Sequence, residues 1–293
     1  MYNKKTLSDI LLDTINYILL AAVCLITLYP FYYVLMASFS DPTLLAQQRG
    51  LMFWPAGYGW EAYKLVFQNP MVPIGYSNTL FYVGVGTLLN IVFTSLGAYA
   101  LSRKNVMFSN PIMMIIVFTM FFGGGLIPSY LLVNALGLYD TRWALILPSL
   151  ISVMNLIIMR TSFQAIPESL EESARVDGAN DFTILFKIII PLSMPVIAVM
   201  ILFYGVGHWN SFFQAMIYLR SRDLYPLQLV LREILIINSS DSMTTGVGAA
   251  DKEYVSETIK YAMIIVSTVP ILVLYPFLQK YFVKGVMIGA IKG

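Results

Sequence analysis

The sequence predicts an all-α integral membrane protein with six transmembrane helices and one charged loop that stays outside the bilayer. Hydrophobic residues make up 58% of its 293 residues and charged residues only 12%, whereas a soluble domain carries roughly 25% charged residues. Within this apolar chain, residues 166–195 carry seven charged side chains, from Glu168 to Lys187. Because moving Asp, Lys or Arg to the bilayer centre costs roughly 2.5 to 3.5 kcal/mol each, this segment cannot span.

Six apolar runs are each long enough to cross a hydrocarbon core of about 30 Å. We expect spans at about 15–39, 76–102, 107–135, 143–162, 188–219 and 261–282, which makes residues 1–293 a single transmembrane domain. The first run, of 25 residues, exceeds the roughly 7 to 15 apolar residues of a secretory signal. We therefore interpret it as a span.

The distribution of basic residues predicts the orientation. Six spans place both chain ends on one side, and the Lys and Arg residues near the spans gather there, at the ends, at Arg103 and in the charged loop. Since such residues favour the cytoplasm, we expect a multi-pass protein of the cell, or inner, membrane with both termini in the cytoplasm. Residues 40–75 and 220–260 are then external and face a soluble partner, with a short interfacial helix within 59–67.

The third predicted span contains three consecutive glycines, Gly123, Gly124 and Gly125, followed by Pro128. Such a sequence allows close packing of helices or produces a local kink. A flexible hinge that lines a transport pathway is the alternative interpretation.

The charged loop begins with a short helix that ends at Gly178. Leu170 and Ala174 fall on one side of it at helical spacing. Its charged side chains point elsewhere: Glu171, Glu172 and Arg175. Gly178 stops the helix because glycine adopts positive φ without the Cβ penalty.

A second helix follows, and Asn180 or Asp181 can cap it through a side-chain oxygen. Its apolar residues repeat at i, i+3, i+4 and i+7 and predict one apolar face: Phe182, Leu185, Phe186 and Ile189. Pro191 and Pro195 then interrupt the helix. Two helices around a glycine form a rigid protrusion, which is either a docking element or an ordinary interfacial loop.

The spans lack the titratable groups that catalysis or ion coupling requires. No Asp, Glu, Lys or Arg occurs in 15–39, 76–102, 105–139, 143–159, 188–219 or 261–279, and the single histidine is His208. The chain also lacks the G-x-x-x-x-G-K-[ST] phosphate loop. We therefore expect no enzyme activity in this chain and an energy source in another.

Cysteine and charge exclude further classes. Cys24 is the only cysteine, which excludes a disulfide within the chain and a thiolate metal cluster. The net charge of +2 is too small to indicate nucleic-acid binding.

Several short motifs resemble the membrane subunits of ATP-binding-cassette (ABC) importers. Glu172-Ser173-Ala174 with Asp177-Gly178-Ala179 and Ile189-Ile190-Pro191 is similar to their EAA loop, although Ser173 stands where alanine is usual. Residues 78–80, 98–103, 209–212 and 279–285 resemble the permeases of carbohydrate importers of the maltose-permease-like branch. Residues 125–160 resemble the subgroup of alginate, oligosaccharide and lipoprotein-type permeases.

This resemblance implies a type I ABC importer permease fold, in which residues 165–187 form a coupling helix seated in a cleft of the ATPase. The residues it assigns to ATPase coupling are Glu171, Glu172, Ser173, Ala174, Asp177, Gly178 and Ala179. It also implies a second, non-identical permease subunit, two ATPase subunits that bind ATP and Mg, and an extracellular or periplasmic solute-binding protein. This chain itself would hold no cofactor and no metal, and lipid would surround it.

Polar and aromatic side chains inside the spans are candidates for a substrate pathway. They are Asn90, Ser152, Asn155, Tyr204, His208, Trp209 and Asn210. Aromatic faces and amides suit a carbohydrate, because sugar rings present C–H faces and hydroxyl groups. We expect an oligosaccharide or polysaccharide, with uronate-containing polymers such as alginate among the candidates. The alternative is that these side chains pack or hydrogen-bond between helices.

Other functions stay open at this point. A related importer could carry glycerol phosphate or a peptide, although the spans offer an anionic solute no Arg or Lys. An ion-coupled carrier or channel, or a membrane scaffold without transport, is the alternative from another class.

Overall fold

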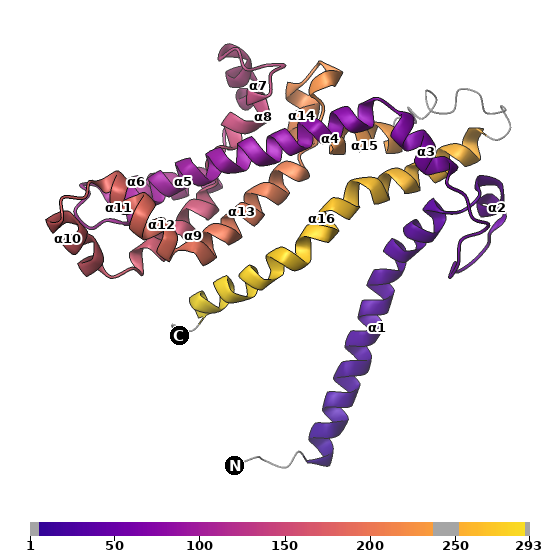
Figure 1. The fold of residues 1–293 in the computed structure, drawn as a ribbon, viewed down its shortest axis with the longest axis horizontal. Helices are drawn as coiled ribbons and strands as arrows, with labels where there is room; N and C mark the ends of the chain where they lie inside the picture. Colours follow the sequence, from indigo (N-terminus) through magenta and orange to yellow (C-terminus); the bar gives the residue numbers. More distant parts are fainter. Residues whose placement is uncertain (1–5, 237–251, 291–293) are drawn as a thin grey trace. The chain divides into compact units, whose positions relative to one another are not determined.

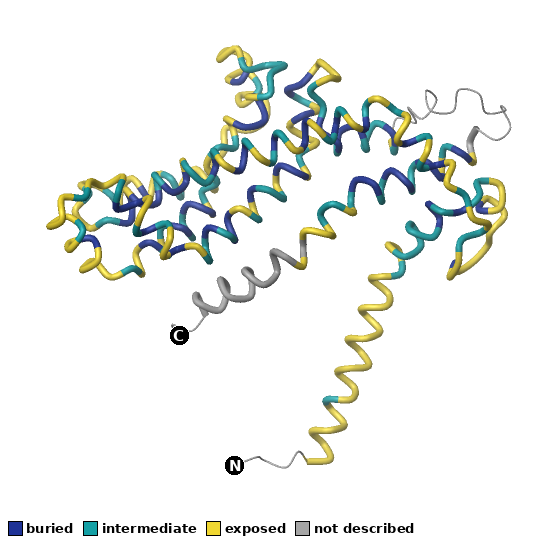
Figure 2. Tube along the Cα trace, in the orientation of Figure 1, coloured by how far each residue is buried: buried dark blue, intermediate teal, exposed yellow. Residues whose placement is uncertain are grey.

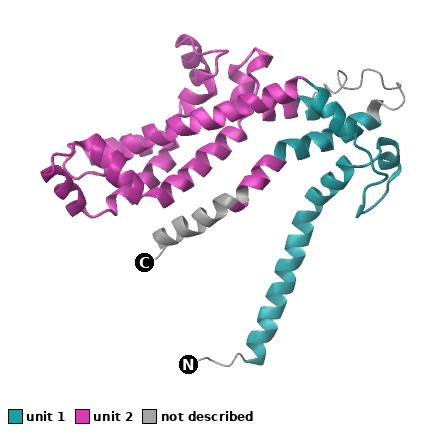
Figure 3. Ribbon diagram, viewed as in Figure 1, with its two compact units in different colours: residues 1–69, 233–268 teal, residues 70–232, 269–293 magenta. Residues whose placement is uncertain are grey.

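The computed structural model describes residues 6–236 and 252–290. Every regular element within these ranges is helical (Figure 1), which confirms the all-α prediction. The ends that carry Lys4, Lys5 and Lys292, and residues 237–251 of the predicted external segment, lie outside the described residues. The chain divides into two compact units, residues 1–69 with 233–268 and residues 70–232 with 269–293 (Figure 3). The single-domain organisation stays a prediction.

The helices of the described ranges provide up to six candidate spans, the predicted number, judged by length and composition. Three are continuous: Leu7–Ser38, Met71–Ser102 and Tyr254–Leu274. Three are bent pairs: Ser109–Phe121 with Leu126–Ala135, Trp143–Ser149 with Val153–Gln164, and Asp181–Leu192 with Met194–Trp209. Half of the candidate spans are therefore broken helices.

The first unit contains α1 (Leu7–Ser38), α2 (Pro42–Gln47), α3 (Glu61–Gln68) and the beginning of α16 (Lys252–Ala290). The helix α1 starts earlier than the apolar run because Thr6 and Asp9 form a capping box, in which the Thr6 backbone N–H donates to the Asp9 carboxylate. Most of α1 is exposed within its unit (Figure 2), as expected of a surface that meets lipid or another chain. The short helix α3 matches the one predicted within 59–67.

In the second unit, α4 (Met71–Phe81), the π-helical η1 (Tyr82–Gly86) and α5 (Thr87–Ser102) follow one another without a break. The helices α9 (Val153–Gln164) and α13 (Met194–Trp209) pack against α5. Their buried side chains include Leu156, Met159 and Met200. The charged loop and the predicted pathway residues of α13 both adjoin this core.

The glycine triplet breaks the third span. The helices α6 (Ser109–Phe121) and α7 (Leu126–Ala135) meet there at 113°. Gly125 has a φ of +84°, and a Cβ added to it or to Gly123 would meet no atom within 4 Å. Backbone conformation therefore explains Gly125, and the 113° bend confirms the interpretation as a local kink.

The fifth span is divided differently from the prediction of 188–219. The elements α11 (Asp181–Ile184), the π-helical η3 (Leu185–Ile189) and α12 (Ile190–Leu192) form one helical run, which meets α13 at 87° between Pro191 and Pro195. The helix α13 ends at Trp209, and α14 (Phe213–Tyr218) is a separate short helix. The break after Trp209 could not be predicted from hydropathy, because residues 188–219 form one predominantly apolar run.

Only part of the predicted apolar face of the second loop helix is buried within the second unit. Leu185 and Ile189 are buried together with Ile184, but Phe182 and Phe186 are 66% and 46% exposed. Phe186 lies within the π-helical turn η3, which departs from the 3.6 residues per turn that the prediction assumed. Phe182 precedes that turn and lines a cavity together with Tyr99 and Arg103.

The loop between α7 and α8 (Trp143–Ile146) is held by Asp140. Its carboxylate accepts hydrogen bonds from the Ser221 hydroxyl at 2.6 Å, the Ser221 N–H at 2.8 Å and the Arg220 N–H at 2.9 Å. These donors, the Ser221 hydroxyl first, hold the pKa of Asp140 below its ordinary value. Residues 220–221 lead into the 3-10 helix η4 (Arg222–Leu224) and α15 (Leu227–Ile236), while α8 continues into the 3-10 helix η2 (Leu147–Ser149).

We expect Asp140→Ala to destabilise the second unit more than Asp140→Asn. Asp140 has a φ of +56°, a conformation that costs most L-residues roughly 1–2 kcal/mol and that asparagine tolerates better. Alanine also removes every acceptor for Ser221. The measurement is the thermal stability of the purified protein in detergent.

Because the pKa of Asp140 is lowered in the folded protein, the contribution of its carboxylate to stability is present above the unfolded pKa near 3.9 and is lost as the pH falls through the folded value. Equal melting temperatures for the two variants at pH 7 would contradict this role.

Candidate functional site

The first half of the charged loop is α10 (Glu168–Val176), which ends as predicted at Gly178. Gly178 has a φ of +83°. Its N–H donates to the Arg175 carbonyl at 3.0 Å, and the Ala179 N–H donates to the Ala174 carbonyl at 2.9 Å. These two bonds form a Schellman motif. Asn180, rather than Asp181, caps α11 by accepting from the Thr183 N–H.

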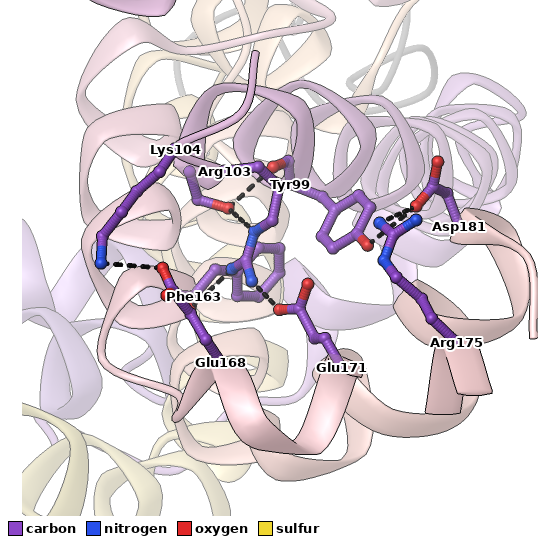
Figure 4. Close-up of polar contacts among 9 residues, drawn as sticks. Tyr99, Arg103, Lys104, Phe163, Glu168, Glu171, Arg175 and Asp181 are labelled. Carbon is purple, nitrogen blue, oxygen red and sulfur yellow. Dashed lines mark hydrogen bonds and ion pairs between the residues drawn. The ribbon is translucent and has the colours of Figure 1, made fainter. Parts of the chain in front are cut away.

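Arg103, the residue directly after α5, connects the loop to the helix core (Figure 4). Its guanidinium donates to the Phe163 carbonyl of α9 and to the Ser102 hydroxyl, each at 2.9 Å. It also forms an ion pair with the Glu171 carboxylate of α10. Desolvation lowers the pKa of Arg103 from its ordinary value, yet an arginine stays protonated in proteins, so the pair is ionic.

The burial of Glu171 differs from the prediction that the charged side chains of α10 point away from the core. Side-chain exposure is 8% for Glu171 and 10% for Arg103. The sequence indicated an apolar edge at Leu170 and Ala174, but Leu170 is 43% exposed. Helical spacing alone cannot show that a cation 68 residues earlier in the chain neutralises this carboxylate.

The other ion pairs of this region are exposed. Lys104 lies 2.9 Å from Glu168, with side-chain exposures of 84% and 55%. Arg175 lies 2.5 Å from Asp181, with exposures of 45% and 61%. Of the ion pairs described around α10, Arg103 with Glu171 is therefore the buried one (Figure 4).

The remaining predicted coupling residues divide between two faces. Ala174 and Ala179 pack against the core of the second unit. The exposed residues are Glu172, Ser173, Asp177 and Gly178, joined by Val176, which is 87% exposed. This exposed surface is available to another protein.

The predicted pathway residues Tyr204, His208 and Asn210 line one cavity of about 420 Å³ at the end of α13. The sequence analysis did not propose the other lining side chains for the pathway: Ser149, Ser211, Phe212, Phe213 and Gln214. Most of them follow directly after Asn210, so the helix break was the signal that could have identified them. The cavity combines aromatic rings with amides, hydroxyls and an imidazole.

Asn90 determines which tautomer the neutral ring of His208 adopts. Its amide nitrogen donates to the carbonyls of Ser149 at 2.9 Å and Leu150 at 2.7 Å, at the break between η2 and α9. Its amide oxygen must therefore accept from His208 Nε2, 2.7 Å away. In the neutral ring the proton then lies on Nε2, and Nδ1 is an acceptor.

Gly86 makes room for this ring. A Cβ at Gly86 would lie 2.5 Å from His208 Nε2, closer than any side chain allows. The hydroxyl of Tyr204 lies 2.8 Å from the Thr94 hydroxyl and accepts from the Ser152 N–H at 3.0 Å. Tyr204 therefore offers the cavity its ring, because its hydroxyl is used within the protein.

The other pathway candidates have structural positions. Ser152 is the N-cap of α9 and accepts from the Asn155 N–H. Asn155 is buried in α9. Trp209 is buried and packs against Tyr76, with ring centroids 6.4 Å apart. In the described residues, no group of three or more His, Cys, Asp or Glu side chains is arranged to hold a metal ion.

Comparison with known proteins agrees with the resemblance seen in the sequence. Residues 91–288 match the family described as binding-protein-dependent transport system inner membrane component. The chain is 41% identical, over 97% of its length and 99% of the relative, to the polygalacturonan/rhamnogalacturonan transport system permease protein YtcP of Bacillus subtilis (strain 168). It is 42% identical to protein LplC of the same organism, over 100% of this chain and 98% of that one.

A solved structure is also similar to this fold. It is a chain in the crystal structure of a bacterial ABC transporter involved in the import of the acidic polysaccharide alginate. The TM-score is 0.90 at 34% sequence identity, covering 96% of this chain and 99% of the other. The likeness therefore extends over both units.

We expect Asn90→Ala to destabilise the protein and to disturb the cavity. The substitution leaves two carbonyls and the His208 Nε2–H without their partner, and each buried unpaired group costs about 1–3 kcal/mol. Asn134→Ala is the control, because Asn134 is an exposed amide in α7. The measurement is the melting temperature of the purified protein, and an unchanged value for Asn90→Ala would refute the role of this amide.

Proposed function

Because the chain belongs to the family of binding-protein-dependent transport system inner membrane components, we propose that it imports carbohydrate as an oligosaccharide or polysaccharide. It is a permease subunit of an ABC importer, in which ATP is hydrolysed by a separate ATPase and solute arrives on a solute-binding protein. In this proposal the chain forms half of the translocation pathway and couples that half to the ATPase.

The cavity at the end of α13 supports a carbohydrate as the solute. Its rings, Tyr204, Phe212 and Phe213, can stack on the C–H faces of sugars, while Asn210 and Gln214 can bond hydroxyl groups. The names of YtcP and of the alginate importer refer to polysaccharides as well.

The cavity also limits what this half of the pathway contacts. None of its lining residues is Lys or Arg, so a uronate carboxylate would find no permanent cation here. Neutral His208 offers Nδ1 as an acceptor for a hydroxyl. This chain therefore contacts hydroxyls and ring faces, and any uronate carboxylate is bound elsewhere along the pathway.

The assembly that we propose contains a second, non-identical permease and two ATPase subunits, which bind ATP and magnesium. The exposed surface of α10, with Glu172, Asp177 and Val176, enters a cleft of one ATPase. Arg103 and Lys104 lie beside α10, and basic residues next to a span favour the cytoplasm. These residues support a cytoplasmic position for α10, and we propose the same side for both termini.

The observation that carries this proposal is the cavity of mixed aromatic and amide character in a chain whose spans lack ion-coupling groups. The test is ATPase activity of the full complex in proteoliposomes, with the binding protein and a panel of neutral and uronate oligosaccharides. We expect one loaded binding protein to stimulate the activity severalfold. Uptake driven by a proton or sodium gradient without ATP would contradict the proposal and support an ion-coupled carrier.

We expect Gly178→Val to assemble with the ATPase but to transport poorly, and Gly178→Asn to retain most transport. A Cβ at Gly178 meets no atom of this chain within 4 Å, so within the chain only its positive φ resists substitution, and valine and asparagine add side chains of similar size. Valine is strained in that conformation, whereas asparagine tolerates it. Uptake of radiolabelled substrate into proteoliposomes measures the difference. Equal uptake by both variants would show that the end of α10 does not matter for coupling.

A further inference from the structure

The guanidinium of Arg103 contacts both α9 and α10 from its position at the end of α5. Arg103 follows α5, donates to Phe163 in the last turn of α9 and pairs with Glu171 in α10. Its position at the end of α9 also suits a cation, since the C-terminus of a helix carries partial negative charge. The same side chain therefore neutralises Glu171 and caps a neighbouring helix (Figure 4).

Side-chain packing alone does not make this connection. Cavities of about 280 Å³ and 290 Å³ adjoin Arg103, and Arg175 and Asn105 line both of them. Around these cavities the described ion pairs of Lys104 and Arg175 are solvent-exposed and hence weak. The buried pair is the polar contact that holds α10 against the end of α5.

Both helices that meet at Arg103 also reach the cavity near α13. The helix α5 carries Asn90 and Thr94, which bond to His208 and Tyr204. Asn90 lies 13 residues before Arg103, or roughly 20 Å at 1.5 Å per helical residue. The helix α9 starts at Ser152, whose N–H donates to Tyr204. A displacement of α10 that moves Arg103 therefore reaches the cavity through rigid helices.

We propose that Arg103 and Glu171 are positioning residues that make α10, α5 and α9 move as one body. This inference rests on the proposed function, because it assumes that α10 receives the motion of an ATPase. The pair transmits that motion without touching solute or nucleotide. Lysine cannot replace Arg103, because its compact ammonium lacks the planar fork that reaches Ser102, Phe163 and Glu171 together.

The first test uses the full complex in proteoliposomes with loaded binding protein. We expect Glu171→Gln and Arg103→Lys to copurify with the ATPase but to lose at least fivefold in the stimulation of ATPase activity by loaded binding protein. Glu168→Gln is the matched control, because it removes a carboxylate of the same helix from an exposed pair. Wild-type stimulation in Glu171→Gln, or an equal loss in Glu168→Gln, would overturn the proposal.

A double variant tests whether the two residues act as a unit. Arg103→Gln combined with Glu171→Gln should lose no more stimulation than the worse single variant, since each change removes the same contact. If the loss of stimulation in the double variant equals the product of the two single losses, Arg103 and Glu171 act independently, and the proposal is overturned. If wild-type activity is itself not stimulated, the proposed function fails, and this outcome is distinct from a failure of the pair.

A crosslink tests the same point with the pair intact. Lys104→Cys and Glu168→Cys place thiols at two exposed positions, with Cys24→Ser removing the only native thiol. A short thiol-reactive crosslinker then joins the turn after α5 to α10. We expect the crosslinked complex to keep its stimulated ATPase activity, because the joined elements already move together. Loss of stimulation that depends on the crosslink would show that they move apart, and the proposal would be wrong.

Discussion

A helix broken inside a bilayer frees backbone groups that lipid cannot hydrate, and the second unit depends on how these groups are satisfied. At the break between η2 and α9, Asn90 bonds the carbonyls of Ser149 and Leu150, and the Tyr204 hydroxyl accepts the N–H of Ser152. The oxygen of the same amide orients His208. The interactions that stabilise the break therefore also shape the cavity.

The polar groups around the end of α13 are uncharged, whereas those around α10 include a buried ion pair. Around α13 the cavity lining contains no Lys or Arg, and polarity comes from amides, hydroxyls and one imidazole. Around α10 a buried carboxylate is neutralised by Arg103, which also caps α9. Since α5 and α9 run between these two regions, they form a continuous path between the proposed ATPase contact and the proposed solute contact.

The sequence predicted the helix ends and caps correctly where the interacting backbone and side-chain groups are close together in the sequence. Gly178 ends α10 and Asn180 caps α11 as expected, because both positions are governed by neighbouring backbone groups. The spans followed from hydropathy, since length and composition decide what crosses a bilayer. Three of the predicted pathway residues line one cavity, but Asn90, Ser152, Asn155 and Trp209 do not, because polarity inside a span does not distinguish a pathway from a helix contact.

By itself, the sequence determined the all-helical membrane fold, the position of the charged loop and the separation of this chain from ATP hydrolysis. These properties depend on composition, periodicity and short motifs. Only the tertiary structure decided that Glu171 is buried, that Phe182 and Phe186 are exposed and that α13 ends at Trp209. Glu171 is buried because Arg103, 68 residues earlier in the chain, pairs with it, and burial in general depends on the surfaces that meet rather than on the pattern of one segment.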